Sequence, residues 1–303
     1  MNVFGSNDDA LPHIPDDITL AQFVLEYEHP LKSERGGVPC LIEDSTGRKI
    51  SFDEVKNNTR ALASVLRFTY SIGQNDVVMV SSPNHTEFPV VLWAVLMLGG
   101  IVSCSNPQFT VGELVHHLRT VKVTFAIAHS SNITTVLSAA LLAGLSSDRV
   151  ILIDRMTQAE PGIPNVHDLR QAGLRQKLAF QERALGPGEG RRKVALLSWS
   201  SGTTGMPKAD WLTKARSRAN AQIGQAYGLT EMTCTLAMIA GTQKRGPLGS
   251  GGRLLPGVRA RVVRPDGSSA NYGEEGEFVV KGPAAALGYL NHERGTRDTF
   301  VDG

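Results

Sequence analysis

The chain has 303 residues, of which 41% are hydrophobic and 20% are charged, so it has enough apolar residues to bury a core in one or two domains and is not extensively disordered. Its 31 lysines and arginines against 29 aspartates and glutamates leave a formal net charge of +2, which excludes the strong positive field typical of nucleic-acid and acidic-membrane binders. Three widely spaced cysteines predict neither a disulfide framework nor a zinc site and favour a reducing compartment.

Helices and strands alternate along the first two thirds of the chain. Capping-box patterns beginning at Ser51 and Thr110 predict two helix starts. Short, wholly apolar runs predict strands that are covered on both faces of a sheet. The expected strands are 77–80, 101–104, 124–128, 150–153 and 194–197, and further helices are expected at 87–98, 134–143 and 166–178. This order predicts an α/β fold with βαβ units and a mostly parallel sheet over about residues 40–200.

The most apolar stretch, residues 88–102, is shorter than the roughly 20 residues of a membrane-spanning helix, and Gly99-Gly100 interrupts it. A buried helix that runs into a strand is the better interpretation. The N-terminus lacks the basic and apolar regions of a secretory signal. We therefore expect a cytoplasmic protein without a membrane span.

The pattern changes after residue 227. Val258, Ala260 and Val262 alternate with two arginines, a pattern typical of a β-strand. The turn residues 265–267 follow, and residues 277–281 form a second expected strand. We expect antiparallel structure here, in a small β-rich subdomain.

Hydroxyls, glycines and a lysine are concentrated in a loop that follows the expected strand 194–197. Backbone N–H groups, hydroxyls and an ammonium group together suit the phosphates of a nucleotide. The spacing of Gly202 and Gly205 from Lys208 differs from the GxxxxGK[ST] loop of ordinary P-loop enzymes. The candidate phosphate-binding residues are Ser200, Ser201, Gly202, Thr203, Thr204, Gly205 and Lys208.

The order of residue types in this loop resembles the phosphate-binding loop of the adenylate-forming, AMP-binding superfamily. A second motif, residues 226–232, resembles the YGxTE element of the same superfamily. The resemblance implies that ATP or AMP contacts Tyr227, Gly228 and Thr230, and that Glu231 binds Mg²⁺. It also implies the large N-terminal α/β domain of acyl-CoA ligases, followed by a small β-rich subdomain.

Three stretches narrow the resemblance to acyl-CoA ligases of the 4-coumarate–CoA-ligase-like branch, including fungal enzymes of secondary metabolism. They are residues 92–100, 106–110 and 113–114. For such an acid–thiol ligase the resemblance implies ATP-dependent adenylation of a carboxylic acid and thioester formation with CoA as co-substrate. It gives no reason to expect a nucleic-acid partner, and it leaves the acid and the oligomeric state open. Some relatives carry a peroxisomal SKL-type tail, which residues 301–303 do not match.

The sequence departs from this pattern at two places. Lys208 and Tyr227 are only 19 positions apart (227 − 208), whereas the resemblance implies a far longer interval that holds part of the acyl pocket. The pattern also stops at residue 303, before the family's ribose-binding Asp and its mobile C-terminal domain with the catalytic lysine, so no catalytic residue is assigned. We divide the chain into residues 1–208, a short junction 209–224, a YGxTE-containing segment 225–256, and a truncated β-rich subdomain 257–303.

These departures leave two hypotheses. The chain is an impaired acyl-CoA ligase-like enzyme, or it is an inactive pseudo-enzyme, a splice product or the product of a wrongly assigned gene structure, with at most weak nucleotide binding. We expect no acyl-CoA synthesis at a useful rate from this chain alone. We also expect poor pairing of the strands beside the junction, and low solubility, because unpaired strand edges invite aggregation.

Three other residue positions favour structural roles. His116 and His117 are adjacent on a helix, where neighbouring residues do not share a face, so they do not predict a metal site. Trp199 is expected to pack beside the loop. Cys234 is expected to be a small buried thiol rather than a nucleophile.

Overall fold

A computed structural model describes residues 4–5, 11, 13–28, 37–155, 162–176, 180–199, 225–233, 235–239 and 250–301. The chain divides into two compact units. One comprises residues 15–199, and the other comprises residues 1–14 together with 200–303.

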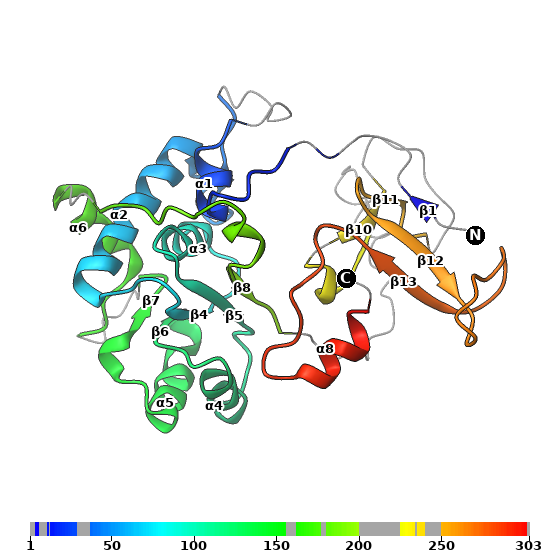
Figure 1. Cartoon of the computed structure of the whole chain (residues 1–303). Coiled ribbons are helices and arrows are strands. Elements are labelled where there is room, and N and C mark those ends of the chain that lie inside the picture. Colours follow the sequence, from blue (N-terminus) through cyan, green and yellow to red (C-terminus); the bar gives the residue numbers. More distant parts are fainter. Residues whose placement is uncertain are drawn as a thin grey trace. The chain divides into compact units, whose positions relative to one another are not determined.

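A five-stranded parallel sheet forms the centre of the 15–199 unit (Figure 1). Its strand order is β7-β6-β4-β5-β8, and all four neighbouring pairs are parallel. The strands are β4 (Val77–Ser81), β5 (Ile101–Ser105), β6 (Phe125–Ala128), β7 (Val150–Leu152) and β8 (Leu196–Leu197). The predicted α/β fold with a parallel sheet is confirmed. Every residue of β4, β6 and β7 is buried, because helices cover both faces of the sheet.

Alternate residues of β4, β6 and β7 enter different cores. Val78 and Val80 of β4 belong to the larger core, whereas Met79 between them belongs to a second one. Residues from α2, α3 and α6 contribute to the larger core, and residues from α4 and α5 contribute to the second. The helices are α2 (Phe52–Tyr70), α3 (Phe88–Met97), α4 (Val111–Thr120), α5 (Ile133–Ala143) and α6 (Val166–Gln176).

Local signals set most helix boundaries where the sequence predicts them. Both hydrogen bonds of a capping box are present at Thr110, whose hydroxyl accepts from the Glu113 amide while the Glu113 carboxylate accepts from the Thr110 amide. At Ser51 the hydroxyl accepts from the Glu54 amide, and Ser51 caps α2. Gly99, which follows the C-cap Leu98 of α3, adopts a φ of +76°, a conformation that favours glycine and ends the helix.

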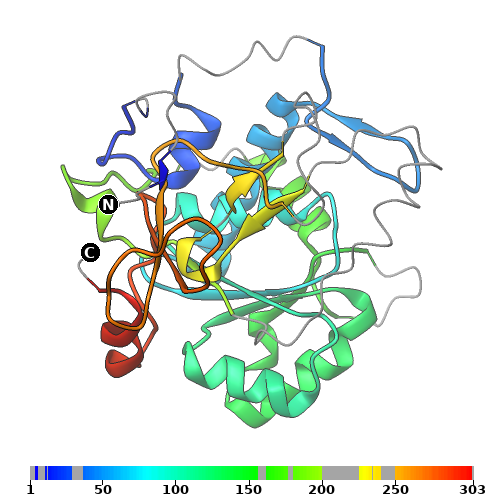
Figure 2. The same ribbon diagram turned by 90° about the vertical axis from the view of Figure 1, so that its right-hand side faces the viewer.

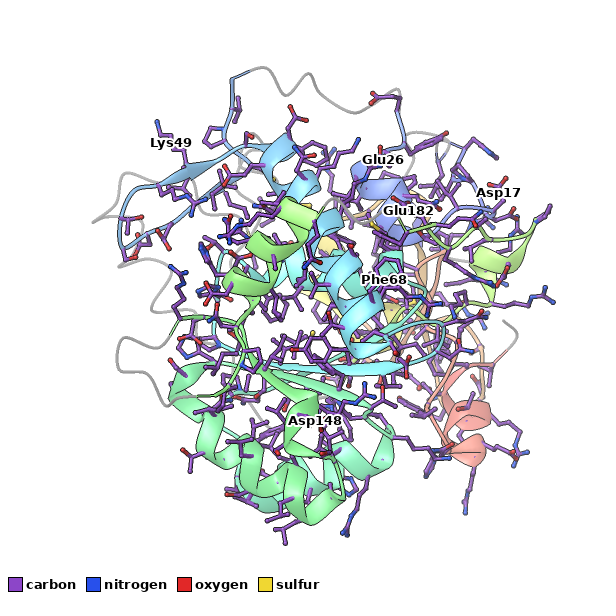
Figure 3. The ribbon with its side chains drawn as sticks, turned by 90° about the vertical axis from the view of Figure 1, so that its left-hand side faces the viewer. Asp17, Glu26, Lys49, Phe68, Asp148 and Glu182 are labelled. Atoms are coloured by element: carbon purple, nitrogen blue, oxygen red, sulfur yellow. The ribbon has the colours of Figure 1, made fainter. Side chains whose placement is uncertain are left out.

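A shorter helix, α1 (Leu20–Leu25), packs against α3, and ion pairs connect its C-terminal end to α2. Glu26, which caps α1, accepts hydrogen bonds from Lys56 at 2.5 Å and from Arg60 at 2.7 Å. Glu182 lies 3.6 Å from the same Arg60, and Figure 3 shows Glu26 and Glu182 near each other. A two-stranded antiparallel hairpin of β2 (Leu41–Ile42) and β3 (Lys49–Ile50) precedes α2.

The other unit contains antiparallel strands, as the late change of pattern predicts (Figure 2). One sheet has the order β1-β12-β13 and a second has the order β11-β10-β9. Their strands are β1 (Phe4–Gly5), β9 (Ala226–Gly228), β10 (Thr235–Met238), β11 (Arg253–Leu254), β12 (Arg259–Val263) and β13 (Glu277–Lys281), and helix α8 (Glu293–Thr299) follows. A small core of Met232, Leu236 and Val258 lies in this unit.

Strand β12 keeps the expected alternation, but burial does not follow it to the end of the strand. Val258 and Ala260 are buried, but Val262 is half-buried and the next residue, Val263, is 8% exposed. The chain folds back after the 265–267 turn. Ser269 forms an antiparallel bridge with Val263, and the Ala270 amide donates to the Val262 carbonyl, so the returning segment pairs with the end of β12.

Among the described residues, the strands on either side of the junction both lie at the edges of their sheets. Of the expected strand 194–197, Leu196–Leu197 forms β8, whose described partner is β5. The described partner of β9 is β10. The low solubility expected from such edges stays a prediction.

Candidate functional site

The candidate loop residues Ser200, Ser201, Gly202, Thr203, Thr204, Gly205 and Lys208 lie outside the described residues, as do the junction 209–224 and Cys234. Tyr227, Gly228, Thr230 and Glu231 are described, and the structure brings these four together in one hairpin. Two described segments are therefore considered separately: Trp199, which directly precedes the loop in the sequence, and the hairpin around Glu231.

Trp199, the last described residue before the loop, is held by polar contacts as well as packing. Its indole Nε1–H donates to Nε2 of His117 at 3.1 Å and lies 3.3 Å from the Ser103 hydroxyl. The Trp199 and His117 rings lie with their centroids 4.5 Å apart. Because Ser103 is on β5 and His117 is on α4, the sheet and a helix together fix the indole one residue before Ser200.

His117 is neutral in this arrangement. Burial, together with the neighbouring His116, lowers its pKa from 6.5 to about 4. Nε2 accepts from Trp199, which places the proton on Nδ1, and Nδ1 is buried without a hydrogen-bond partner in the described structure. His116, by contrast, is exposed, and its ring meets Trp199 edge to face with the centroids 5.9 Å apart.

The Glu231 motif forms the turn of a hairpin. Strand β9 ends at Gly228, a 3₁₀ turn, η4 (Thr230–Met232), follows, and Thr233 adopts a φ of +62° before β10 begins. Met232 is buried in the small core, which anchors the turn, while Thr230 is exposed and Glu231 is half-buried. The local sequence thus places one apolar anchor next to two oxygen-bearing side chains.

The segment after β13 fixes Glu231 from a second direction. The backbone carbonyl of Glu231 accepts from the Ala286 amide at 2.8 Å, and Thr233 donates to the Ala284 carbonyl at 2.7 Å. The phenol of Tyr289 donates to Oε1 of Glu231 at 2.6 Å. This hydrogen bond to Glu231 is the main cause of a raised pKa of Tyr289. The backbone and the carboxylate of Glu231 are thus held separately.

Tyr227, the expected adenine neighbour, is 44% exposed on β9. Its ring meets Phe278 of β13 edge to face, with the centroids 6.1 Å apart. A Cβ at Gly251 would lie 2.9 Å from Cβ of Tyr227, so the glycine permits a close approach of the two backbones. The exposed ring leaves apolar surface for a flat ligand.

The donor set around Glu231 fits a magnesium ion that arrives with a nucleotide. Among the described ranges, no group of three or more His, Cys, Asp or Glu side chains is arranged to hold a metal. Mg²⁺ commonly uses only one or two protein carboxylates and takes its other oxygens from substrate phosphates and water. A single half-buried carboxylate beside the Thr230 hydroxyl meets that requirement, whereas it is insufficient for a metal bound by protein alone.

A polar cluster that the sequence did not predict lies at the carboxyl edge of the parallel sheet. Asp154, after β7, accepts from the Ser130 backbone amide at 2.8 Å and lies 3.4 Å from Nε2 of His129, after β6. Asn132 donates to the Ser81 hydroxyl at 2.8 Å. In the sequence, these residues have one feature in common: each follows or ends an expected strand. Ligands bind at the carboxyl ends of strands in open α/β sheets, so this position was the signal that could have indicated the cluster.

A sequence model of the family described as "AMP-binding enzyme" matches residues 32–215 and 209–290. The chain is 26% identical over 201 residues to 4-coumarate–CoA ligase 4 of Arabidopsis thaliana, covering 66% of this chain and 34% of that protein. It is 32% identical over 177 residues to 4-coumarate–CoA ligase of Pinus taeda, covering 58% of this chain and 30% of that protein. The chain therefore spans about a third of the length of these curated relatives.

Solved structures share the fold at low identity. The anthranilate CoA ligase AuaEII in complex with anthranoyl-AMP matches with a TM-score of 0.75 and 16% identity, covering 96% of this chain and 74% of that one. The luciferase-like enzyme from the mealworm Zophobas morio matches with a TM-score of 0.71 and 14% identity, covering 100% and 94%. In the described part of the chain, no helix has the length and apolar character needed to cross a membrane.

Proposed function

The chain belongs to the family of AMP-binding enzymes, and from that premise we propose that it binds ATP with Mg²⁺ through residues 200–208 and the Thr230–Glu231 turn. The observation that carries the proposal is the Glu231 carboxylate, presented on a 3₁₀ turn and held at both its backbone and its side chain. Tyr227 and Gly228, on the strand that enters this turn, are then suited to contact the adenosine.

The proposed reaction is adenylation of a carboxylic acid. The acid's carboxylate attacks the α-phosphate of ATP, pyrophosphate leaves, and an acyl-adenylate remains; a thiol, CoA, then displaces AMP to give a thioester. The chain's own task is to position the phosphates and to balance their charge. Lys208 supplies a positive charge, and the hydroxyls and backbone amides of 200–205 supply hydrogen-bond donors. Mg²⁺, bound through Glu231, would neutralise negative charge on the phosphate oxygens.

For the acid we propose an aromatic or medium-chain carboxylate, in the manner of 4-coumarate–CoA-ligase-like enzymes of secondary metabolism. The curated relatives are named for 4-coumarate, and one solved relative for anthranilate, both aromatic acids. Those names describe those proteins, and they support the class of acid proposed for this chain.

A second candidate is favoured by one specific feature, the short interval between Lys208 and Tyr227. If residues that would line the acyl pocket are missing from that interval, the acid is not held near the α-phosphate. Such positioning contributes roughly 7–11 kcal/mol in well-oriented reactions, so its loss alone would reduce turnover by many orders of magnitude. The chain would then be a nucleotide-binding pseudo-enzyme.

Acid-dependent exchange of labelled pyrophosphate into ATP distinguishes the two candidates. Residues 1–303 are incubated with ATP, Mg²⁺ and a panel of aromatic and fatty acids. Exchange that is stimulated by one acid and lost in Lys208→Ala, but kept in the exposed control Lys49→Ala, supports adenylation. ATP binding without exchange for any acid supports the pseudo-enzyme. Exchange that is unchanged in Lys208→Ala would refute the proposed site.

A further inference from the structure

Tyr289 stands out because its phenol reaches a functional carboxylate from a distant part of the chain. The two residues are separated by 58 positions, yet the phenolic oxygen lies 2.6 Å from Oε1 of Glu231. Glu231 is half-buried and Tyr289 is 38% exposed, so the contact is not a core contact made only to bury apolar area. A phenol donating to an ionised carboxylate is one of the stronger hydrogen bonds in proteins.

The tyrosine is itself held in place by helix α8. Its backbone amide donates to the Thr296 hydroxyl at 2.9 Å, and its ring meets Phe300 edge to face at 5.6 Å between centroids. Gly288, directly before it, has a φ of +135°, a conformation open to glycine. A Cβ at Gly288 would also lie 2.6 Å from Thr296, so the chain passes the helix closely at this point.

The backbone on both sides of the phenol is tied to the same turn. Ala286 donates to the carbonyl of Glu231, and Ala284 accepts from Thr233. Residues 284–289 therefore run along η4 with three hydrogen bonds, of which only the one from Tyr289 reaches the Glu231 carboxylate. The backbone bonds are enough to fix the turn itself, and the phenol adds the orientation of the carboxylate.

We propose that Tyr289 is a positioning residue for Glu231: its phenol holds Oε1 so that the rest of the carboxylate faces the divalent cation that accompanies ATP. The inference deepens the proposed function and rests on it. An ionised carboxylate has about four lone-pair positions, so one hydrogen bond to Oε1 leaves positions for a metal. An unrestrained glutamate side chain has several rotamers. A phenol that selects one of them lowers the conformational-entropy cost of ordering the side chain when the metal binds.

The test measures divalent-cation binding directly in the presence of ATP, with Mn²⁺ as the probe and electron paramagnetic resonance as the readout. Tyr289→Phe removes only the hydroxyl and keeps the ring contact with Phe300. We expect it to weaken Mn²⁺ binding about 10-fold, the lower end of the range for a hydrogen bond to a charged group. The control Tyr272→Phe makes the same chemical change at a residue that is 83% exposed and should leave binding unchanged.

A double-mutant cycle separates positioning from a general structural effect. In the Glu231→Gln background the change Tyr289→Phe should have no further effect on Mn²⁺ binding, because the phenol acts through the carboxylate. If Tyr289→Phe weakens ATP binding equally with and without Mn²⁺, or has the same effect in the Glu231→Gln background, its role is only structural and the inference is overturned.

The failure of the proposed function would look different. Mn²⁺ that binds together with ATP and depends on Glu231 and Tyr289, in a chain that shows no acid-dependent pyrophosphate exchange, would sustain the inference and refute the proposed adenylation. Mn²⁺ binding that is unchanged by Glu231→Gln would overturn the inference, because Glu231 would then hold no cation.

Discussion

Arg170 of α6 has a buried, charged side chain that forms an ion pair with Glu87. Replacing it by Met tests how much this pair contributes to the stability of the 15–199 unit. The Arg170 side chain is 4% exposed, and its guanidinium donates to Glu87 at 2.9 Å and to Asn58 of α2 at 3.0 Å. Glu87, at the start of α3, has a side chain that is 13% exposed. One residue thus joins three helices on the same side of the sheet.

Removing the guanidinium leaves the Glu87 carboxylate buried without its cation. Breaking a buried pair in this way costs about 3–5 kcal/mol. Since Glu87 keeps a little contact with solvent, we expect Arg170→Met to lie near the lower end, at about 3 kcal/mol. For a unit of this size that corresponds to a fall in Tm of roughly 6–12 °C.

The matched control is Arg155→Met. Arg155 pairs with Asp168, another residue of α6, but both side chains are more than half exposed, at 61% and 57%. Exposed pairs of this kind contribute about 0–1 kcal/mol, so the control should change little. The double variant Arg170→Met with Glu87→Leu removes both charges and should regain most of the stability lost in Arg170→Met.

The assay is urea unfolding combined with amide hydrogen exchange in α2, because the two compact units need not unfold in a single transition. Hydrogen exchange reports the opening of the 15–199 unit by itself. The reasoning is refuted if Arg170→Met and Arg155→Met cost the same, or if the double variant is as unstable as Arg170→Met alone.

Three further predictions concern stability. Because burial holds the pKa of His117 at about 4, below its usual 6.5, the unfolded chain binds this proton first as the pH falls. Stability is full above pH 6.5 and falls towards pH 4 by up to about 3 kcal/mol, so urea melts of His117→Phe should show a smaller loss over this range. Thr110→Ala removes the α4 cap and should lower the free energy of unfolding by about 1 kcal/mol in the same melts. An unchanged free energy of unfolding would show that the cap does not stabilise the protein. Gly173→Ala places a Cβ 2.2 Å from the Ala61 carbonyl oxygen and should lower the free energy of unfolding by about 1–3 kcal/mol. In the control Gly112→Ala the new Cβ meets nothing within 4 Å, so the change should be neutral or stabilising. Equal Tm values for the two variants would contradict close packing at Gly173.

The elements that the sequence predicts well are those whose cause is local. The apolar run at 77–80 becomes β4, and the Thr110 capping box forms with both of its hydrogen bonds. In each case the residues that determine the structure lie within a few positions of one another.

The features that the sequence does not reveal depend on distant contacts. The pairing of β1 with β12 joins segments of the chain more than 250 positions apart (259 − 5 = 254), and two residues are too short a pattern to predict it. His117 is expected only to have a structural role, and nothing local indicates that it accepts from Trp199. The hydrogen bond between Tyr289 and Glu231 likewise follows from how residues 284–289 return to the turn.

The most direct test of a nucleotide site at Lys208 and Glu231 is the change in Tm of residues 1–303 on addition of ATP with Mg²⁺. At 100 times its dissociation constant a ligand stabilises the folded state by about 2.7 kcal/mol, so a clear rise is expected for the wild type. Lys208→Ala should reduce the rise in the presence and in the absence of Mg²⁺, and Glu231→Gln should reduce it only when Mg²⁺ is present, while the exposed control Lys49→Ala behaves as the wild type. A wild-type Tm that ATP does not raise, or an equal rise in Lys208→Ala, would contradict the assignment.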